Sequence, residues 1–217
     1  MEPVHRTSAA RMLALLTSGQ ATPARFRTAL MKVPAARRDA WLDLVFGLEE
    51  LPDDGPQLPR GCTPYLPCPV DALLRVLTHA EVQSGDVFVD LGSGLGRAAA
   101  LARLLTGAAS IGIEVQPELV QASRLLAQRL KVSRFSVVEG DAARLTEFIS
   151  IGSVFFLYCP FSDQRLERVL DSLAAIAQTR QIRVCCVQLP LPSRPWLTPL
   201  ALPDEDLAVY RSSPLRW

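Results

Sequence analysis

Five short apolar runs, separated by segments with helical spacing, constrain the fold of this chain more than any other feature. The runs cover residues 86–91, 110–115, 135–140, 153–159 and 182–189. Their nearly continuous apolar character is typical of strands that are buried on both faces. Strands that alternate with helices form a parallel sheet with right-handed crossovers. We therefore predict an α/β fold with a doubly wound, mostly parallel sheet of seven strands.

The segments between the runs carry helix signals. Pro117 stands at a first helical position, and Leu119, Leu126 and Leu130 then recur on one face. Ser162 is placed to cap the next helix. After the last run, residues 196–197 and 207–210 predict a closing antiparallel pair of strands.

The first third of the chain has a different pattern. Residues 1–50 read as helical, with Thr22 as an N-cap before Pro23 and with Trp41 on an apolar helix face. Residues 51–69 hold six of the seventeen prolines, which excludes regular structure there. We divide the chain into a helical extension or cap, residues 1–60, and an α/β domain, residues 61–217. We expect the helices of the extension to wall the substrate site.

Composition narrows the class of protein. A length of 217 residues with 49% hydrophobic and 21% charged residues fits one globular core. The formal net charge of +1 gives the whole chain no electrostatic reason to bind nucleic acid or an anionic membrane. The net charge does not exclude a local basic patch. Only two histidines are present, so a zinc site or a histidine triad is not expected.

Location is predicted from two further observations. The apolar run from Met12 to Leu16 is too short for a signal peptide or a spanning helix. Five cysteines without a CxxC pattern indicate reduced thiols. We predict a cytoplasmic protein without membrane contact, and the sequence leaves its oligomeric state open.

A glycine-rich turn follows the first apolar run. The chain reads VFVDLGSGLGR from Val87 to Arg97 and continues into the alanine-rich residues 98–105. Glycines between a strand and a helix allow a tight turn and a close approach of the backbone to a ligand. The dinucleotide fingerprint GxGxxG needs its third glycine one position later than Gly96, which disfavours an NAD-dependent oxidoreductase.

The stretch DLGSGLGR closely resembles the first motif of class I S-adenosylmethionine-dependent methyltransferases. This resemblance implies S-adenosyl-L-methionine as cofactor, with the glycines beneath its methionine part and Asp90 holding its ammonium group. The residues of the motif assigned to the cofactor are Asp90, Leu91, Gly92, Ser93, Gly94, Gly96 and Arg97.

Two later strand ends match further positions of that family. Glu114, with Val115 beside it, stands where the family carries the acid that binds the ribose hydroxyls. Gly140, Asp141 and Ala142 stand where a carboxylate and a neighbouring amide recognise adenine, and Asp141 is the choice for the adenine amino group. Asp141 is also placed to cap a following helix.

The end of the fourth run resembles the family's fourth motif, at the sheet edge where ligands bind. It reads Tyr158-Cys159-Pro160-Phe161, without the Asn or Asp common in methyltransferases of amide and planar nitrogens. We assign these four residues and Tyr65 to the acceptor site. Tyr158 also faces the cofactor, and Phe161 and Tyr65 wall the pocket.

The stretch from Tyr65 through the glycine turn is also similar to nucleosomal lysine methyltransferases that lack a SET domain and to many bacterial proteins. The predicted function is methyl transfer from S-adenosylmethionine to a nitrogen or oxygen acceptor, either a small molecule or a protein lysine or amine. The alternative is a non-catalytic protein that binds S-adenosylmethionine as a sensor or partner subunit. That alternative is favoured if the N-terminal segment closes the pocket over Tyr158.

Overall fold

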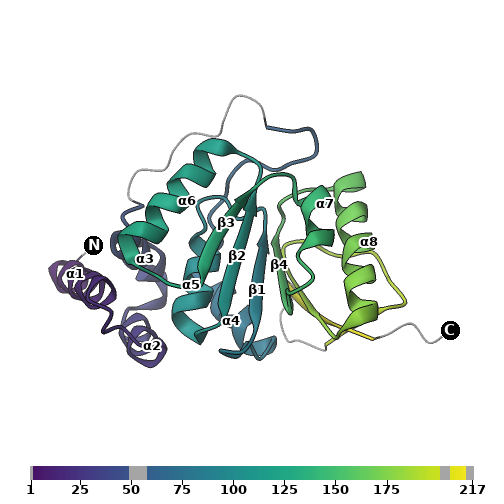
Figure 1. The fold of residues 1–217 in the computed structure, drawn as a ribbon. Helices are drawn as coiled ribbons and strands as arrows, with labels where there is room; N and C mark the ends of the chain where they lie inside the picture. The colour runs from purple at the N-terminus through teal and green to yellow at the C-terminus, as the bar shows by residue number, and fades with distance from the viewer. Residues whose placement is uncertain (1, 49–57, 201–205, 214–217) are drawn as a thin grey trace.

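A computed structural model describes residues 2–48, 58–200 and 206–213, which form one α/β domain with helices packed on both faces of a sheet (Figure 1). The seven strands lie in the order β3-β2-β1-β4-β5-β7-β6. Their bounds are β1 Val87–Leu91, β2 Ala109–Glu114, β3 Phe135–Glu139, β4 Val154–Tyr158, β5 Arg183–Val187, β6 Leu197–Pro199 and β7 Leu207–Ser212. The doubly wound, mostly parallel sheet predicted from the sequence is confirmed.

Strand direction follows the apolar pattern. The first five strands pair in parallel, in agreement with their continuous apolar character. β7 lies antiparallel between β5 and β6 and supplies the predicted closing pair. From β1, the strands β2 and β3 follow on one side of the sheet, and β4 and β5 follow on the other side. The strand order therefore switches beside β1, and open α/β sheets bind their ligands at such a switch point.

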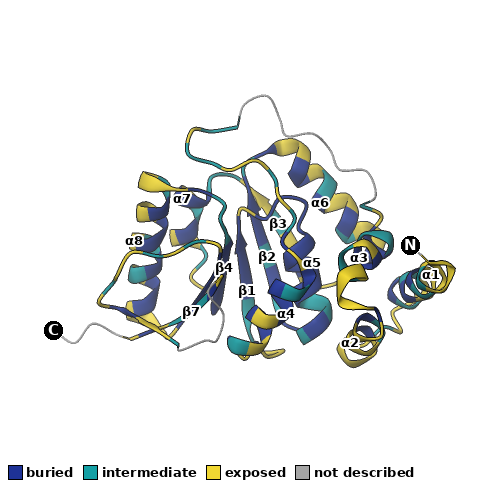
Figure 2. Cartoon of the chain, turned by 180° about the vertical axis from the view of Figure 1, so that it is seen from behind, coloured by how far each residue is buried: buried dark blue, intermediate teal, exposed yellow. Residues whose placement is uncertain are grey.

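The helices divide into two layers. One layer contains α4 Val70–His79, α5 Arg97–Thr106 and α6 Pro117–Leu130, and the other contains α7 Ala142–Leu145, the 3-10 turn η2 Thr146–Phe148 and α8 Asp163–Thr179. Successive side chains of β4 pack against opposite helix layers. Phe156 is buried on the side of α4, α5 and α6, whereas Phe155 and Leu157 are buried on the side of α7 and α8. The central strands β1 and β4 are almost entirely buried and are dark blue in Figure 2.

Local signals placed most helix starts correctly. Thr22 caps α2 by accepting a hydrogen bond of 3.2 Å from the Arg25 amide, and Pro117 opens α6. Ser162 does precede α8, but its hydroxyl donates to the Asp163 carboxylate over 2.9 Å instead of accepting a helix amide. The predicted capping bond of Ser162 is therefore wrong, since the side chain makes no hydrogen bond to a helix amide and is turned to the Asp163 carboxylate.

The N-terminal helices are α1 Pro3–Thr17, α2 Pro23–Met31, the 3-10 turn η1 Ala35–Arg37 and α3 Arg38–Phe46. They lie at the flank of the α4 to α6 layer and share one hydrophobic core with it (Figure 1). Trp41 is fully buried there and packs edge-on against Phe26, with ring centroids 5.9 Å apart. The extension is thus a lateral addition to the domain core, and Trp41 is a core residue.

Three further structural findings bear on class. Across the described ranges, no helix has the length and apolar character required to cross a membrane. All five cysteines are free thiols. Within residues 2–48, 58–200 and 206–213, His, Cys, Asp and Glu form no cluster suited to a metal ion.

Candidate active site and cofactor pocket

A pocket opens at the carboxyl ends of β1, β2 and β4. Its place in the sheet is the one where open α/β folds bind their ligands. The predicted residues that line it are Asp90, Gly92, Ser93, Arg97, Glu114, Val115, Gly140, Asp141, Ala142, Tyr158, Cys159, Pro160, Phe161 and Tyr65. The fold therefore brings together residues that lie far apart in the sequence.

The glycine turn forms the floor of the pocket and allows close contacts that a side chain would prevent. Gly92 and Gly94 adopt φ angles of 82° and 52°, which favour glycine. A Cβ atom on Gly94 would lie 2.2 Å from the ring of Tyr65, and one on Gly92 would lie 2.4 Å from Pro160 Cβ. The turn is thus packed directly against the aromatic ring and against the segment that follows β4.

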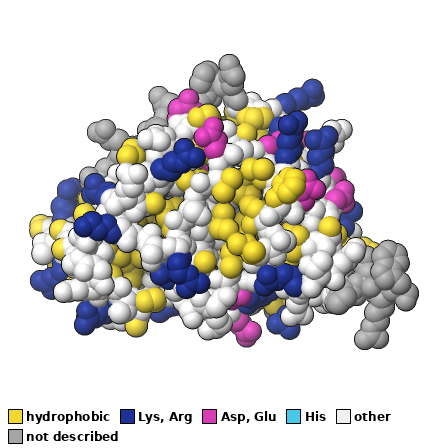
Figure 3. All heavy atoms as spheres, viewed as in Figure 1, with side chains coloured by type: hydrophobic (Ala, Val, Ile, Leu, Met, Phe, Trp, Pro, Cys, Tyr) yellow, Lys and Arg dark blue, Asp and Glu magenta, His cyan; other side chains and the backbone are white. Residues whose placement is uncertain are grey.

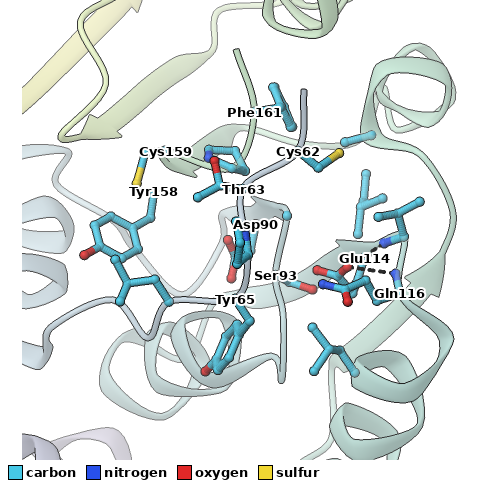
Figure 4. Close-up of a pocket in the computed structure, with 18 of the residues that line it drawn as sticks. Cys62, Thr63, Tyr65, Asp90, Ser93, Glu114, Gln116, Tyr158, Cys159 and Phe161 are labelled. Atoms are coloured by element: carbon cyan, nitrogen blue, oxygen red, sulfur yellow. Dashed lines mark hydrogen bonds between the residues drawn. The ribbon is translucent and has the colours of Figure 1, made fainter. Parts of the chain in front are cut away.

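Asp90 lies at the centre of the site, at the end of β1 (Figure 4). It is 3% exposed, and burial together with the nearby charge of Glu114 raises its pKa to about 7. A buried carboxylate is costly unless a cation or hydrogen-bond donors compensate it. The site therefore favours a ligand that brings a positive charge to this point.

Glu114 ends β2 and is held by three backbone amides. Its Oε2 accepts a hydrogen bond from Gly94 and its Oε1 accepts bonds from Val115 and Gln116, all over 2.8 Å. Two of these bonds are drawn in Figure 4. The carboxylate thus ties the glycine turn to the end of β2, a structural task that the sequence did not predict.

Asp141 performs the predicted capping and also forms an ion pair. Its Oδ1 accepts a hydrogen bond of 3.0 Å from the Ala143 amide at the start of α7, and Arg165 Nη1 lies 2.7 Å from the same oxygen. Arg165 also donates from Nε to the Arg60 carbonyl over 2.9 Å. One guanidinium of α8 therefore links Asp141 to the segment before α4, residues 58–69.

That segment crosses over the pocket and is the main feature that sequence reasoning missed. Residues Cys62 and Phe161 form an antiparallel bridge; the Thr63 amide donates to the Pro160 carbonyl over 3.0 Å. In Figure 4 Cys62 and Thr63 lie above Asp90 and Tyr65 lies below Ser93. Proline content predicted an irregular segment on a surface, but nothing in its residues indicated which surface.

Tyr158 and Cys159 lie on the opposite side of Asp90 from Glu114 and Gln116 (Figure 4). Both are partly exposed, and burial raises the pKa of the phenol and of the thiol. Cys159 has a φ of 34°, in the left-handed region that is unfavourable for a residue with a Cβ. Such strain commonly marks functional positions, and the raised pKa makes a reactive thiolate unfavourable.

Arg97 differs from its predicted role. Its guanidinium lies against α3: Nε donates to Asp43 over 2.8 Å, Nη2 donates to Asp39 over 2.9 Å, and Nη1 donates to the Cys68 carbonyl over 2.7 Å. Its side chain is only 5% exposed. The charge of Arg97 is therefore used to join α5, α3 and the pocket wall. Arg97 also lines the pocket, and its contact with the cofactor stays a prediction.

Some predicted residues serve the site from outside the pocket. Leu91 is fully buried in the core, and Gly96 packs against Ser123 and Phe135. Lining residues that the sequence did not single out are Leu58, Cys62, Thr63, Pro64, Leu66, Cys68, Ala98, Ile113, Gln116, Leu119 and Phe156. No described residue of α1 to α3 lines the pocket, so these helices do not wall it as we expected. They also do not close it over Tyr158.

Comparisons with known proteins agree with this geometry. Residues 67–141 match the family model "Histone methylation protein DOT1". An RNA methyltransferase from Salinibacter ruber, solved with S-adenosyl-L-homocysteine, is 28% identical, with a TM-score of 0.57 over 70% of this chain and 96% of that one. Together, the family match, this structure and the fold support a class I S-adenosylmethionine-dependent methyltransferase.

More distant structures share the fold of this methyltransferase. The putative methyltransferase yhhF from Escherichia coli is 19% identical, with a TM-score of 0.53 over 74% of this chain and 89% of that one. Precorrin-6y C5,15-methyltransferase from Geobacter metallireducens GS-15 is 14% identical, with a TM-score of 0.51 over 76% of this chain and 100% of that one. No curated protein sequence gives a significant match.

The pocket fits the cofactor of this enzyme class, S-adenosyl-L-methionine. The buried carboxylate of Asp90 is suited to a cationic group, and Gly92 and Gly94 carry no side chain beside it. Glu114 and Asp141 present two further carboxylates at successive strand ends on one side of the pocket. The enzyme thus offers a charged end and an extended wall for a nucleoside that carries an amino acid.

Proposed function

We propose that this enzyme transfers a methyl group from S-adenosylmethionine to a nitrogen acceptor placed beside Tyr158. The bound cofactor supplies an electrophilic methyl group on a sulfonium, whose leaving group becomes neutral. Asp90 would hold the ammonium end, and the wall formed by Glu114 and Asp141 would hold the ribose and adenine. Tyr158 and Cys159 would then face the reacting side, with Phe161 and Tyr65 as walls.

The observation that carries this proposal is the arrangement of Figure 4, in which Asp90 lies between two differently equipped halves of the pocket. One half carries Glu114 and Gln116 and suits the polar nucleoside. The other half carries Tyr158 and Cys159, whose hydroxyl and thiol groups are uncharged and can form hydrogen bonds. Alignment of nucleophile and methyl carbon is the main requirement of such a reaction and can contribute up to about 7–11 kcal/mol.

A nitrogen acceptor is favoured over a hydroxyl acceptor by the titrating groups at this end. A hydroxyl must lose its proton to become a good nucleophile, which calls for a base near the methyl group. Burial raises the pKa of Tyr158 and Cys159, so both stay protonated at neutral pH. Neither described histidine lines the pocket. A neutral amine already carries its lone pair, and Tyr158 can orient it by a hydrogen bond. A lysine ammonium reaches this neutral form by releasing its proton to water before transfer, without a protein base beside the methyl group.

The carrier of the acceptor nitrogen is a protein amine or a small molecule in this proposal. The match to histone methylation proteins over residues 67–141 supports a protein amine. The similarity to an RNA methyltransferase makes RNA a further substrate to assay. We also propose a cytoplasmic location on the basis of the five free thiols, to be checked by cell fractionation.

The test combines binding with transfer of a labelled methyl group. We expect Tyr158→Phe to keep the affinity for S-adenosylhomocysteine in calorimetry and to lower the rate of transfer by about 10-fold or more, the loss of one neutral hydrogen bond of about 1 kcal/mol or more. Asp90→Asn should instead weaken cofactor binding itself. Transfer to no amine, peptide or RNA acceptor, with cofactor binding intact, would refute the proposed reaction.

A further inference from the structure

The N-terminal helices carry a charge that the rest of the chain does not share. Residues 1–38 contain seven Lys and Arg against one acidic residue, a formal net charge of +6. Residues 39–217 contain sixteen Lys and Arg against twenty-one acidic residues, a net charge of −5. The overall charge of +1 therefore hides a basic segment that holds α1, α2 and η1, followed by a remainder with a net negative charge. Such asymmetry is typical of proteins that bind polyanions.

Six of these seven basic side chains are exposed: Arg6, Arg11, Arg25, Arg27, Lys32 and Arg37. None of them takes part in an ion pair with another described residue. Figure 3 shows basic side chains over the N-terminal helices, on the left, while the acidic side chains visible in that view lie elsewhere. The charge of this surface is thus available to a partner.

Three of the cations converge on one feature. An open groove between α1 and α2 is lined by the cations Arg11, Arg25 and Lys32 and by the hydroxyl residues Ser8 and Thr28. The apolar residues Met12, Leu15, Ala24 and Ala29 complete its lining. Arg25 donates from Nη1 to the Gln20 carbonyl over 3.1 Å, which orients its guanidinium. No acidic residue lines this groove within the part of the chain that the structure describes. Cations together with hydroxyl donors match phosphate oxygens.

The basic surface continues across α2. A second depression on the other side of that helix is lined by Arg103 and Lys131, from α5 and the end of α6. The two depressions share α2 as their common wall, so the cations lie along a stretch of surface rather than at one point. A chain of phosphates needs such an extended series of contacts, whereas a single phosphate does not.

We propose that the groove between α1 and α2 binds the sugar–phosphate backbone of a nucleic acid. Five of the six exposed cations are arginines, whose planar guanidinium binds phosphate in a bidentate manner. A bilayer fits less well, because an interfacial helix must insert its apolar face. In α1 and α2 the apolar face is buried in the protein core, where Met12, Phe26 and Leu30 are at most 3% exposed.

This binding does not depend on the acceptor proposed above, because no residue of the groove lines the catalytic pocket. Failure of the proposed methyl transfer and failure of nucleic-acid binding are therefore separate results. A loss of nucleic-acid binding in a variant that still binds S-adenosylhomocysteine concerns the groove alone.

The test measures binding of the full-length protein to fluorescently labelled single-stranded RNA and duplex DNA by anisotropy over a range of salt. The test variant is Arg11→Gln, Arg25→Gln and Lys32→Gln together. Loss of three phosphate contacts should reduce the salt slope by about 2 for a single strand and weaken binding on the order of 100-fold at about 0.1 M salt. The RNA and DNA arms show which backbone is preferred.

The matched control removes three exposed arginines from the far side of the domain, Arg144→Gln, Arg168→Gln and Arg211→Gln. It should bind nucleic acid like the wild type. Both variants must bind S-adenosylhomocysteine normally, and the double variant Arg11→Gln with Lys32→Gln replaces the triple variant if the latter does not fold.

Several outcomes would overturn the proposal. They are absence of binding by the wild type at low salt, equal loss in the control variant, and no change in the groove variant. Equal competition by poly-glutamate at matched charge would point to an acidic protein instead. Binding to vesicles that contain phosphatidylserine, with no binding to RNA or DNA, would point to a membrane.

Discussion

Replacement of Arg97 by Met tests whether the N-terminal helices are an integral part of the cofactor domain. The guanidinium donates hydrogen bonds to Asp39, Asp43 and the Cys68 carbonyl, from a side chain that is 5% exposed. Removal of one partner of a buried ion pair costs about 3–5 kcal/mol. Because the side chains of Asp39 and Asp43 are 51% and 32% exposed, water recovers part of this loss. We expect a destabilisation of about 3 kcal/mol.

For a chain of this length, 1 kcal/mol lowers the Tm by about 2–4 °C, so the Arg97→Met variant should melt about 6–12 °C lower in calorimetry. The difference should shrink as pH falls through the pKa of Asp43, which burial raises and which the Arg97 guanidinium lowers in part. The sign follows because the pair stabilises the fold only while the aspartates are ionised. Cofactor affinity should also fall, because Arg97 directly follows Gly96 of the glycine turn.

Arg103→Met is the matched control for this prediction. Arg103 lies on the same helix, is partly exposed and donates one hydrogen bond of 2.8 Å to the Ser133 carbonyl. Its loss should cost less than about 1 kcal/mol. A double-mutant cycle with Asp43→Asn should further show a coupling of about 1 kcal/mol or more. An unchanged Tm for Arg97→Met, or an equal drop for both variants, would refute the reasoning.

Three further predictions concern the pocket. Affinity for S-adenosylmethionine should rise about tenfold per pH unit up to the pKa of Asp90, about 7, and then level off. The reason is that the carboxylate must be ionised to attract an ammonium group. Calorimetry on the Asp90→Asn variant should show no such rise. Gly94→Ala should abolish cofactor binding because its Cβ meets Tyr65, whereas Gly19→Ala, with φ +71° and open space, should bind normally in the same titration. Glu114→Gln should lower the Tm by several degrees, because a glutamine side chain is a weaker acceptor than a carboxylate for the backbone N–H groups of Gly94, Val115 and Gln116. An unchanged melting curve would contradict that role.

Much of the fold was predictable because its signals are local. Continuous apolar runs indicated buried parallel strands, and the helix-start signals at Thr22 and Pro117 placed α2 and α6 correctly. The glycine turn after β1 indicated a ligand site because glycines there allow close backbone approach and because the stretch resembles the first methyltransferase motif. These features depend on residues within a few positions of one another.

The roof of the pocket and the place of the N-terminal helices were not predictable in this way. The bond between the Thr63 amide and the Pro160 carbonyl joins segments nearly a hundred residues apart, and neither segment carries a pattern that specifies the other. The same holds for Arg97, which resembled a cofactor residue by its place in a motif. Its contacts with α3 depend on how two helices meet across the core.

The amino-acid sequence by itself determined the strand-and-helix alternation, the cofactor motif and the family, because hydrophobic periodicity and turn chemistry act over short distances. Tertiary structure decided which segment covers the pocket, that Arg97 serves the fold, and that the cations of α1 and α2 converge on one groove. Those outcomes require residues from distant segments to meet in space, and that meeting is set by packing of the whole core.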